Sequence, residues 1–260
     1  MGLVKRYIKP VCVVVAPILK AYFTWLKRYS NHPEKCSFET RYKKLSALCK
    51  KVSKGLNVDY YFEGFDKLDP NEVYCFIGNH LSFFDALTVL SAIDNKMSVI
   101  AKKEVEGYPF VYTAVKMLEG ILIPRDDLRG TLKLMKTVEE DMVNRNKSWM
   151  IFPEGTRTKD ERLVPQKFHS GTFRTPTRAK VTIVPVCIWG SDRVLQTNPV
   201  YKRYPVYASA LKPITYDEYK NMTTDEIACL CHERIVKEQF VLRRKDHEQM
   251  LKDNKNYKIS

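Results

Sequence analysis

Strand-like and helix-like segments alternate along most of this chain. Strand-like runs lie at 58–65, 73–78, 98–101, 120–124, 149–152, 181–188 and 206–210. Segments with the helical spacing of apolar positions lie between most of them, at 83–94, 108–118 and 131–144, and a last one covers 216–245. Short apolar strands that alternate with helices are typical of an α/β sheet covered by helices on both faces. We therefore predict one α/β domain over residues 58–260.

Residues 1–57 have a different pattern and are predicted to form a separate helical segment. A charged, helix-compatible stretch covers 39–54 and should stop at Gly55. Before it, an apolar run at 11–19 is interrupted by Lys and Pro on its flanks, and it is shorter than the ~20 residues needed to cross a bilayer. No small-residue cleavage site follows it, which disfavours a signal peptide.

The same N-terminal residues fit a helix, or a broken pair of helices, lying in the membrane interface. Tyr22 and Trp25 would then sit at the level of the lipid headgroups, and Lys27 and Arg28 would contact anionic lipid. The alternative is a helix packed on the protein core. Both remain open at the level of the sequence.

The charge of the chain indicates a polyanionic partner. Hydrophobic residues make up 44% and charged residues 28%, but the net charge is +14. Nucleic acid, an anionic membrane or a phosphate-bearing substrate could each balance it. The sequence shows no basic-aromatic stripe and no nucleic-acid-reading module, so we expect no nucleic acid. Seven Cys without a C-x-x-C pair favour reduced thiols and no metal site.

A His and an Asp lie five positions apart just after the strand-like run at 73–78. A histidine at a strand end, His80, is accessible to substrate yet rigidly held, and Asp85 could bond its second ring nitrogen. This geometry requires Asn79 and His80 to lie in a turn and Ser82 to cap the following helix. Alternatively, the two residues are a capping histidine and a first-turn acid favoured by the helix dipole. No nucleophile accompanies the pair, which suggests that the substrate supplies the attacking hydroxyl.

Further cations follow other strand-like runs, and one of the motifs also contains a glycine, Gly155. Lys102 follows the run at 98–101, Arg125 follows the run at 120–124, and the motif at 152–157 ends in Arg157. Ligands of α/β sheets bind beyond the carboxyl ends of strands, so these residues could meet at one edge. Arginine suits bidentate contact with phosphate, and glycine lets backbone amides approach an anion.

Taken together, these blocks resemble the glycerolipid acyltransferase family, and within it the bacterial 1-acyl-sn-glycerol-3-phosphate acyltransferases. Asn79-His80 with Asp85 is similar to the NHxxxxD motif of the family. Residues 120–125 match its GxxxxR-type block, 152–157 its FPEGTR block, and 184–186 its apolar proline block, in the same order. The resemblance covers about residues 58–210.

The resemblance implies a central mixed sheet flanked by helices and an acyl transfer to the sn-2 hydroxyl of lysophosphatidic acid. His80 would be the general base and Asp85 its partner. The substrate phosphate would be held by three cations, which are Arg157, Lys102 and Arg125. The loop of Glu154, Gly155 and Thr156 would approach the same phosphate. Asn79 and Ser82 would support the site. No cofactor is implied beyond an acyl donor: acyl-CoA, acyl carrier protein thioester or acyl phosphate.

The chain departs from the family at one position. His169 stands where the family often has a lysine after its FPEGTR block, and Lys167 could substitute. The acceptor could therefore be glycerol 3-phosphate or another lysophospholipid instead. A basic membrane-binding protein without catalysis is a further alternative. In the leading interpretation the protein works at an anionic membrane surface, on the cytoplasmic face of the cell membrane.

Overall fold

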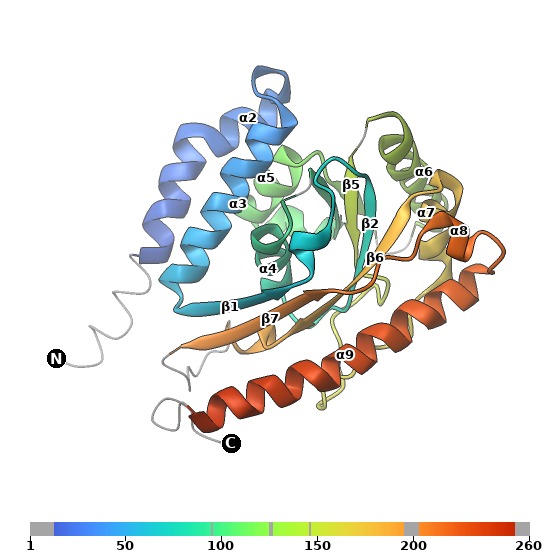
Figure 1. The fold of residues 1–260 in the computed structure, drawn as a ribbon. Helices are drawn as coiled ribbons and strands as arrows, with labels where there is room; N and C mark the ends of the chain where they lie inside the picture. Colours follow the sequence, from blue (N-terminus) through green and yellow to red (C-terminus); the bar gives the residue numbers. More distant parts are fainter. Residues whose placement is uncertain (1–12, 95, 125–126, 146, 195–202, 253–260) are drawn as a thin grey trace.

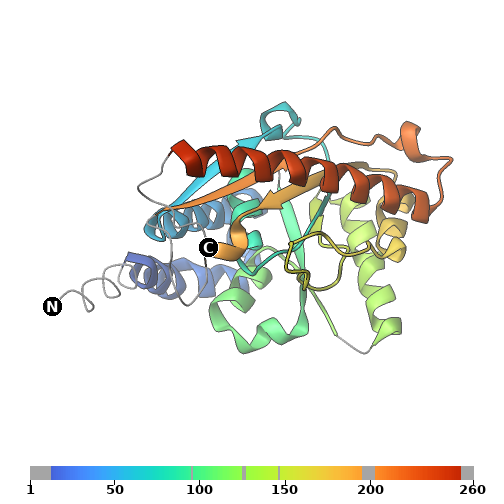
Figure 2. The ribbon, with the colours of Figure 1, turned by 90° about the horizontal axis from the view of Figure 1, so that it is seen from below.

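The fold is a mixed seven-stranded sheet between two layers of helices (Figures 1 and 2). The computed structural model of the 260-residue chain describes residues 13–94, 96–124, 127–145, 147–194 and 203–252. The strand order is β1-β7-β6-β2-β5-β3-β4. Strands β6, β2, β5, β3 and β4 are parallel to one another. Strand β7 pairs antiparallel with β6, and β1 pairs parallel with β7, so β7 and β1 run opposite to the other five. The predicted fold class is confirmed.

All seven predicted strands are present, with small shifts of their ends. Their bounds are β1 Val58–Glu63, β2 Tyr74–Gly78, β3 Met97–Lys102, β4 Ile121–Ile123, β5 Ser148–Ile151, β6 Thr182–Trp189 and β7 Tyr204–Ala210. The helices are α2 Lys27–Asn31, α3 Phe38–Gly55, α4 Phe84–Ala92, α5 Pro109–Met117, α6 Leu128–Asn144, α7 Arg174–Ala179, α8 Tyr216–Tyr219 and α9 Thr224–Lys252. Short π or 3₁₀ turns are η1 Tyr22–Leu26, η2 Pro33–Lys35, η3 Phe65–Lys67, η4 Lys103–Gly107, η5 Ser170–Phe173 and η6 Ser191–Arg193.

Alternate side chains of the central strands enter two different cores. Along β2, Cys75 and Ile77 belong to the cluster that includes α6 and α9, whereas Phe76 belongs to the cluster that includes α3, α4 and α5. Trp149 and Met150 of β5 divide in the same way. Since both faces of the sheet are buried, the strands are apolar throughout, which is why the sequence shows continuous apolar runs.

The predicted single helix at 216–245 is wrong in one respect, because the structure divides it into α8 and α9. Thr215 and Glu218 form a capping box at the start of α8. Thr223 and Glu226 bond reciprocally at the start of α9, where each side chain accepts the backbone amide of the other residue. Two capping boxes eight residues apart start two helices, since each fixes a helix N-terminus.

The N-terminal helices contact the core on one side and leave apolar side chains uncovered on the other. Residues 13–21 are helical and lead into η1. Ala21 and Leu26 are buried, whereas Phe23 is 78% exposed. In the part of the chain that the structure describes, no helix is both long and apolar enough to cross a membrane. The interfacial placement and the boundary at residue 57 stay predictions, and residues 1–12 lie outside the described part.

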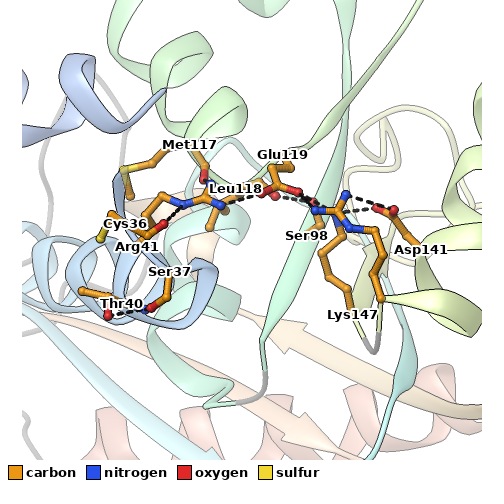
Figure 3. A network of polar contacts seen from close by, with 11 residues as sticks. Cys36, Ser37, Thr40, Arg41, Ser98, Met117, Leu118, Glu119, Asp141 and Lys147 are labelled. Carbon is orange, nitrogen blue, oxygen red and sulfur yellow. Dashed lines mark hydrogen bonds and ion pairs between the residues drawn. The ribbon is translucent and has the colours of Figure 1, made fainter. Parts of the chain in front are cut away.

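An ion-pair network fastens α3 to the edge of the sheet where β4 and β5 begin (Figure 3). Arg41 donates to the Met117 carbonyl oxygen and to the Glu119 carboxylate. The ammonium of Lys147 lies 3.5 Å from Glu119 and 2.5 Å from Asp141. Burial acts to raise the pKa of Glu119, but Arg41 and the other neighbouring cations hold that pKa below its usual value. The network lies at the opposite end of the parallel strands from the predicted site.

Candidate active site

The predicted pair of His80 and Asp85 is brought together beyond the carboxyl end of β2. Nδ1 of His80 lies 2.7 Å from Oδ2 of Asp85. Asp85 is fully buried in the first turn of α4, and the side chain of His80 is 23% exposed. No described residue hydrogen-bonds to Nε2 of His80. The ring therefore presents one nitrogen to a substrate while the other is bound to a carboxylate.

Asp85 is held in place by donors from two strand ends. Its Oδ2 also accepts the amides of Leu81 at 2.7 Å and Ser82 at 2.9 Å, while its Oδ1 accepts the hydroxyl of Ser191. Ser191 follows β6 and is fully buried, 106 residues from Asp85 along the chain. A buried carboxylate needs such partners, because leaving its charge without them is costly. Sequence reasoning missed Ser191, although its place just after a parallel strand was an available signal.

Ser82 and Asn79 support the turn, and the role predicted for Ser82 needs a correction. Ser82 was predicted to be the N-cap of this helix, but the N-cap of α4 is Phe83, one residue later. Its hydroxyl still accepts the amide of Phe84 at 3.0 Å and donates to the Ser191 carbonyl at 3.0 Å. The Asn79 amide group bonds both the N–H and the C=O of Ile188 in β6. Asn79 therefore extends the pairing of β2 with β6 by a side chain.

Glu154 ties the loop after β5 to the backbone of His80. One carboxylate oxygen accepts the His80 amide at 2.7 Å, and the other accepts the Gln166 amide at 2.8 Å. Burial raises the pKa of Glu154, although both amides act to lower it. The His80 carbonyl in turn accepts the amide of Thr158 at 2.8 Å. Glu154 thus positions the histidine's main chain rather than facing an anion directly.

Two aromatic rings, neither predicted, contact the principal site residues. The ring of Phe152 stacks on His80 with 4.4 Å between ring centroids. The guanidinium carbon of Arg157 lies 4.4 Å from the centre of the Phe83 ring. Arg157 is exposed and forms no ion pair with the described residues. Because an aromatic ring orients the guanidinium without using its N–H groups, all of its side-chain donors stay available to a phosphate.

The tip of the loop after β5 is open to an approaching anion. Gly155 is exposed at φ +65°, a left-handed conformation that favours glycine. A side chain at this position would approach the His169 ring to within 3.6 Å. His169 is exposed, as is Lys167, while Thr156 is half-buried. The residue that departs from the family pattern therefore borders the loop.

The sheet topology also places Lys102 at the same edge, although not in contact with His80. Lys102 is exposed at the end of β3. Because β5 lies between β2 and β3, the two strand ends are roughly 10 Å apart at ~4.8 Å per strand. Arg125, the third predicted cation, lies outside the described residues.

This arrangement suits a substrate that carries both a hydroxyl and a phosphate. The histidine can remove the proton of the hydroxyl, and the cations can bind the phosphate. Nε2 of His80 is free to accept the proton, and Asp85 would stabilise the imidazolium that forms. Exposed cations border the same edge of the sheet. Among the described residues, no serine or cysteine side chain hydrogen-bonds to His80.

The comparisons with known proteins agree with this geometry. A sequence model of the family described as Acyltransferase matches residues 59–189, which is half of the chain. This chain belongs to the acyltransferase family.

Named relatives are 1-acyl-sn-glycerol-3-phosphate acyltransferases. The chloroplastic protein of Brassica napus is 25% identical over 196 residues, covering 74% of this chain and 56% of the relative. The Escherichia coli protein is 27% identical over 171 residues, covering 66% of this chain and 67% of the relative. The chain thus spans about half the length of the plant relatives that it matches.

The fold is also found in a solved structure. The crystal structure of the 1-acyl-sn-glycerophosphate acyltransferase from Thermotoga maritima superposes with a TM-score of 0.71 and 18% identity. The superposition covers 92% of this chain and 98% of the other. At this identity the likeness shows a common fold.

Proposed function

We propose that this acyltransferase moves a fatty acyl group from an activated donor to the sn-2 hydroxyl of lysophosphatidic acid, giving phosphatidic acid. The observation that carries the proposal is the His80–Asp85 pair, whose open Nε2 shares a sheet edge with Arg157. The names of the relatives support the same substrate.

In the proposed reaction, Nε2 of His80 takes the proton of the acceptor hydroxyl as its oxygen attacks the donor's carbonyl carbon. The tetrahedral intermediate then collapses, the bond from carbon to the leaving sulfur or phosphate oxygen breaks, and His80 returns the proton to the leaving group. Asp85 stabilises the imidazolium between the two steps. The donor is acyl-CoA, an acyl carrier protein thioester or acyl phosphate. Each is already activated, so the transfer needs no further cofactor.

Phosphate recognition in this proposal falls to exposed cations. Arg157 binds the acceptor phosphate, with Lys102 and Arg125 supporting it, and the loop of Gly155 and Thr156 approaches the anion. Glu154 acts on His80 through its backbone. Proton transfer of this kind contributes ~10²–10⁴-fold, so positioning by these groups must supply much of the remaining acceleration.

We also propose that the protein works on the cytoplasmic face of the cell membrane, bound to anionic lipid. The net charge of +14 and the exposed apolar side chains of the N-terminal helix support this. Phe23→Ser should weaken binding to anionic vesicles, measured by cosedimentation. Unchanged partitioning would refute an interfacial role. Because Ala21, Leu26 and Ser30 are buried, this point substitution is safer than deleting the segment.

The deciding experiment crosses the three donors with a panel of acceptors in mixed micelles. The panel contains lysophosphatidic acid, glycerol 3-phosphate and other lysophospholipids, because His169 replaces the usual lysine beside the loop. His80→Gln should lower kcat by ~10²–10⁴-fold. The matched control is His247→Gln, which changes an exposed histidine of α9. If the wild-type protein transfers an acyl group with none of the combinations of donor and acceptor, the proposed enzymatic activity is refuted.

A further inference from the structure

Most of the exposed large apolar side chains belong to three elements that contact one another. Thirteen large apolar side chains are exposed in the described part of the chain, and eight of them lie on three neighbouring elements. The eight are Val13, Val15, Leu19, Phe23, Phe83, Tyr108, Phe110 and Val111. They belong to the N-terminal helix, the start of α4 and the start of α5. Soluble proteins rarely leave such residues together without a ligand or partner that covers them.

Aromatic contacts arrange these residues in two groups, Phe83 with Tyr108 and Phe110 with Tyr22 and Phe23, which adjoin at the start of α5. We define the aromatic strip as Phe83, Tyr108, Phe110, Tyr22 and Phe23. The ring centroids of Phe83 and Tyr108 are 6.0 Å apart, those of Phe110 and Tyr22 are 4.9 Å apart, and those of Tyr22 and Phe23 are 5.3 Å apart. Tyr108 and Phe110 belong to the same turn at the start of α5. Figures 1 and 2 both show α5 beside the N-terminal helices.

The two ends of the strip differ in their surroundings. At one end, Phe83 lies under the guanidinium of Arg157, the cation assigned to the acceptor phosphate. At the other end, Phe23 is 78% exposed on the helix assigned to the membrane interface. A molecule with a phosphate at one end and a hydrocarbon chain at the other would match this polarity.

We propose that the aromatic strip binds the hydrocarbon chain of the lysophospholipid acceptor, leading from the bilayer at Phe23 to the phosphate site at Arg157. This rests on the proposed function, because it assumes that a lysophospholipid is the acceptor. The chain lies along the outer surface of the protein over the faces of the rings. The acceptor then reaches His80 without its hydrocarbon leaving apolar surroundings.

The charges beside the strip favour lipid as the occupant. A pocket of about 230 Å³ borders Tyr22 and is lined by Lys27, Lys116, Ser30 and Asn31, with Glu106 as its one acid. The Lys116 ammonium also lies 5.7 Å from the ring centre of Tyr112. Aromatic rings flanked by lysines are typical of surfaces at the headgroup level of a membrane. A protein partner would instead be expected to meet a strip depleted of lysine.

The test compares two acceptors that differ in chain length only. Oleoyl and hexanoyl lysophosphatidic acid are presented in the same neutral mixed micelles with the same donor. The double substitution Tyr108→Ser with Phe110→Ser should lower the ratio of the two kcat/KM values, long over short, about ten-fold. This corresponds to a chain covering ~55 Å² of ring surface at ~25 cal/mol per Å².

Phe240→Ser is the matched control, because Phe240 is 60% exposed on α9, which covers the opposite face of the sheet (Figure 1). Its ratio should equal that of the wild type. An unchanged ratio in the double variant overturns the proposal. So does an equal fall with both acceptors, which would mean that the strip only docks the protein on the micelle.

Equilibrium binding of the two lysophosphatidic acids separates failure of this inference from failure of the proposed function. The wild type could show no turnover and still bind the long-chain lipid about ten-fold more tightly than the double variant does. That result would support binding of the hydrocarbon chain by the aromatic strip and would refute the proposed reaction. If the wild type and the double variant bind the long-chain lipid equally, the strip is refuted whatever the activity.

Discussion

Ser191→Ala removes the only donor that the described residues offer to Oδ1 of Asp85. Asp85 keeps its contacts with His80, Leu81 and Ser82 through Oδ2. A hydrogen bond to a charged group contributes ~1.5–3 kcal/mol, and both side chains here are fully buried. We therefore expect the free energy of unfolding to fall by about 2 kcal/mol.

The same substitution should affect catalysis through the orientation of the carboxylate. Asp85 would turn more freely, so His80 would be held less firmly and its imidazolium would be less stabilised. We expect kcat to fall about ten-fold, which corresponds to ~1.4 kcal/mol of lost transition-state stabilisation. The KM for the acceptor should stay unchanged, because Ser191 lies behind Asp85 and does not contact the phosphate loop.

Ser209→Ala is the matched control for Ser191→Ala. Ser209 is also buried in the sheet, but its hydroxyl has no hydrogen-bond partner among the described residues. Deleting it should change neither stability nor kcat appreciably. Urea unfolding gives the stability, and steady-state kinetics on fully folded protein give kcat and KM. This role of Ser191 is refuted if Ser191→Ala retains wild-type kcat, or if KM rises while kcat stays constant.

Three further substitutions test separate contacts. Phe83→Leu removes the ring under Arg157 and should raise the acceptor KM about 2- to 5-fold with little change in kcat, since an exposed cation–π contact contributes ~0.5–1 kcal/mol; an unchanged KM would contradict this role. Glu154→Gln tests a carboxyl whose pKa is raised by burial. The contribution of Glu154 to the free energy of unfolding is full below its ordinary pKa of 4.5 and declines as the pH rises through the raised value. The difference in this free energy between wild type and variant should therefore narrow with rising pH. A difference that widens would contradict the raised pKa. Glu119→Gln should cost about 3 kcal/mol in urea unfolding near pH 7, whereas Glu39→Gln, which breaks an exposed pair, should leave the free energy of unfolding nearly unchanged. Because the pKa of Glu119 is lowered, its contribution is present above pH 4.5 and should be lost as the pH falls further.

Much of the fold could be predicted because its signals are local. Each strand carries a run of apolar residues, and each helix between them carries its own periodicity, so both can be recognised without knowing their neighbours. The largest error, the single helix at 216–245, arose where two capping boxes interrupt a continuous helical pattern. The N-cap of α4 was predicted one residue too early, at Ser82, because its hydroxyl accepts the amide of Phe84 as a capping side chain would, whereas Phe83 forms no side-chain capping bond.

The sequence by itself determined which residues could do the chemistry. His80 and Asp85 are five residues apart, and Arg157 belongs to a compact motif, so a short segment contains each functional group. Tertiary structure decided their partners. Ser191 reaches Asp85 because β6 pairs with β2, and Glu154 reaches His80 because β5 pairs with β2 on the other side. Strand order depends on how whole elements pack together, and no local spacing in the chain encodes it.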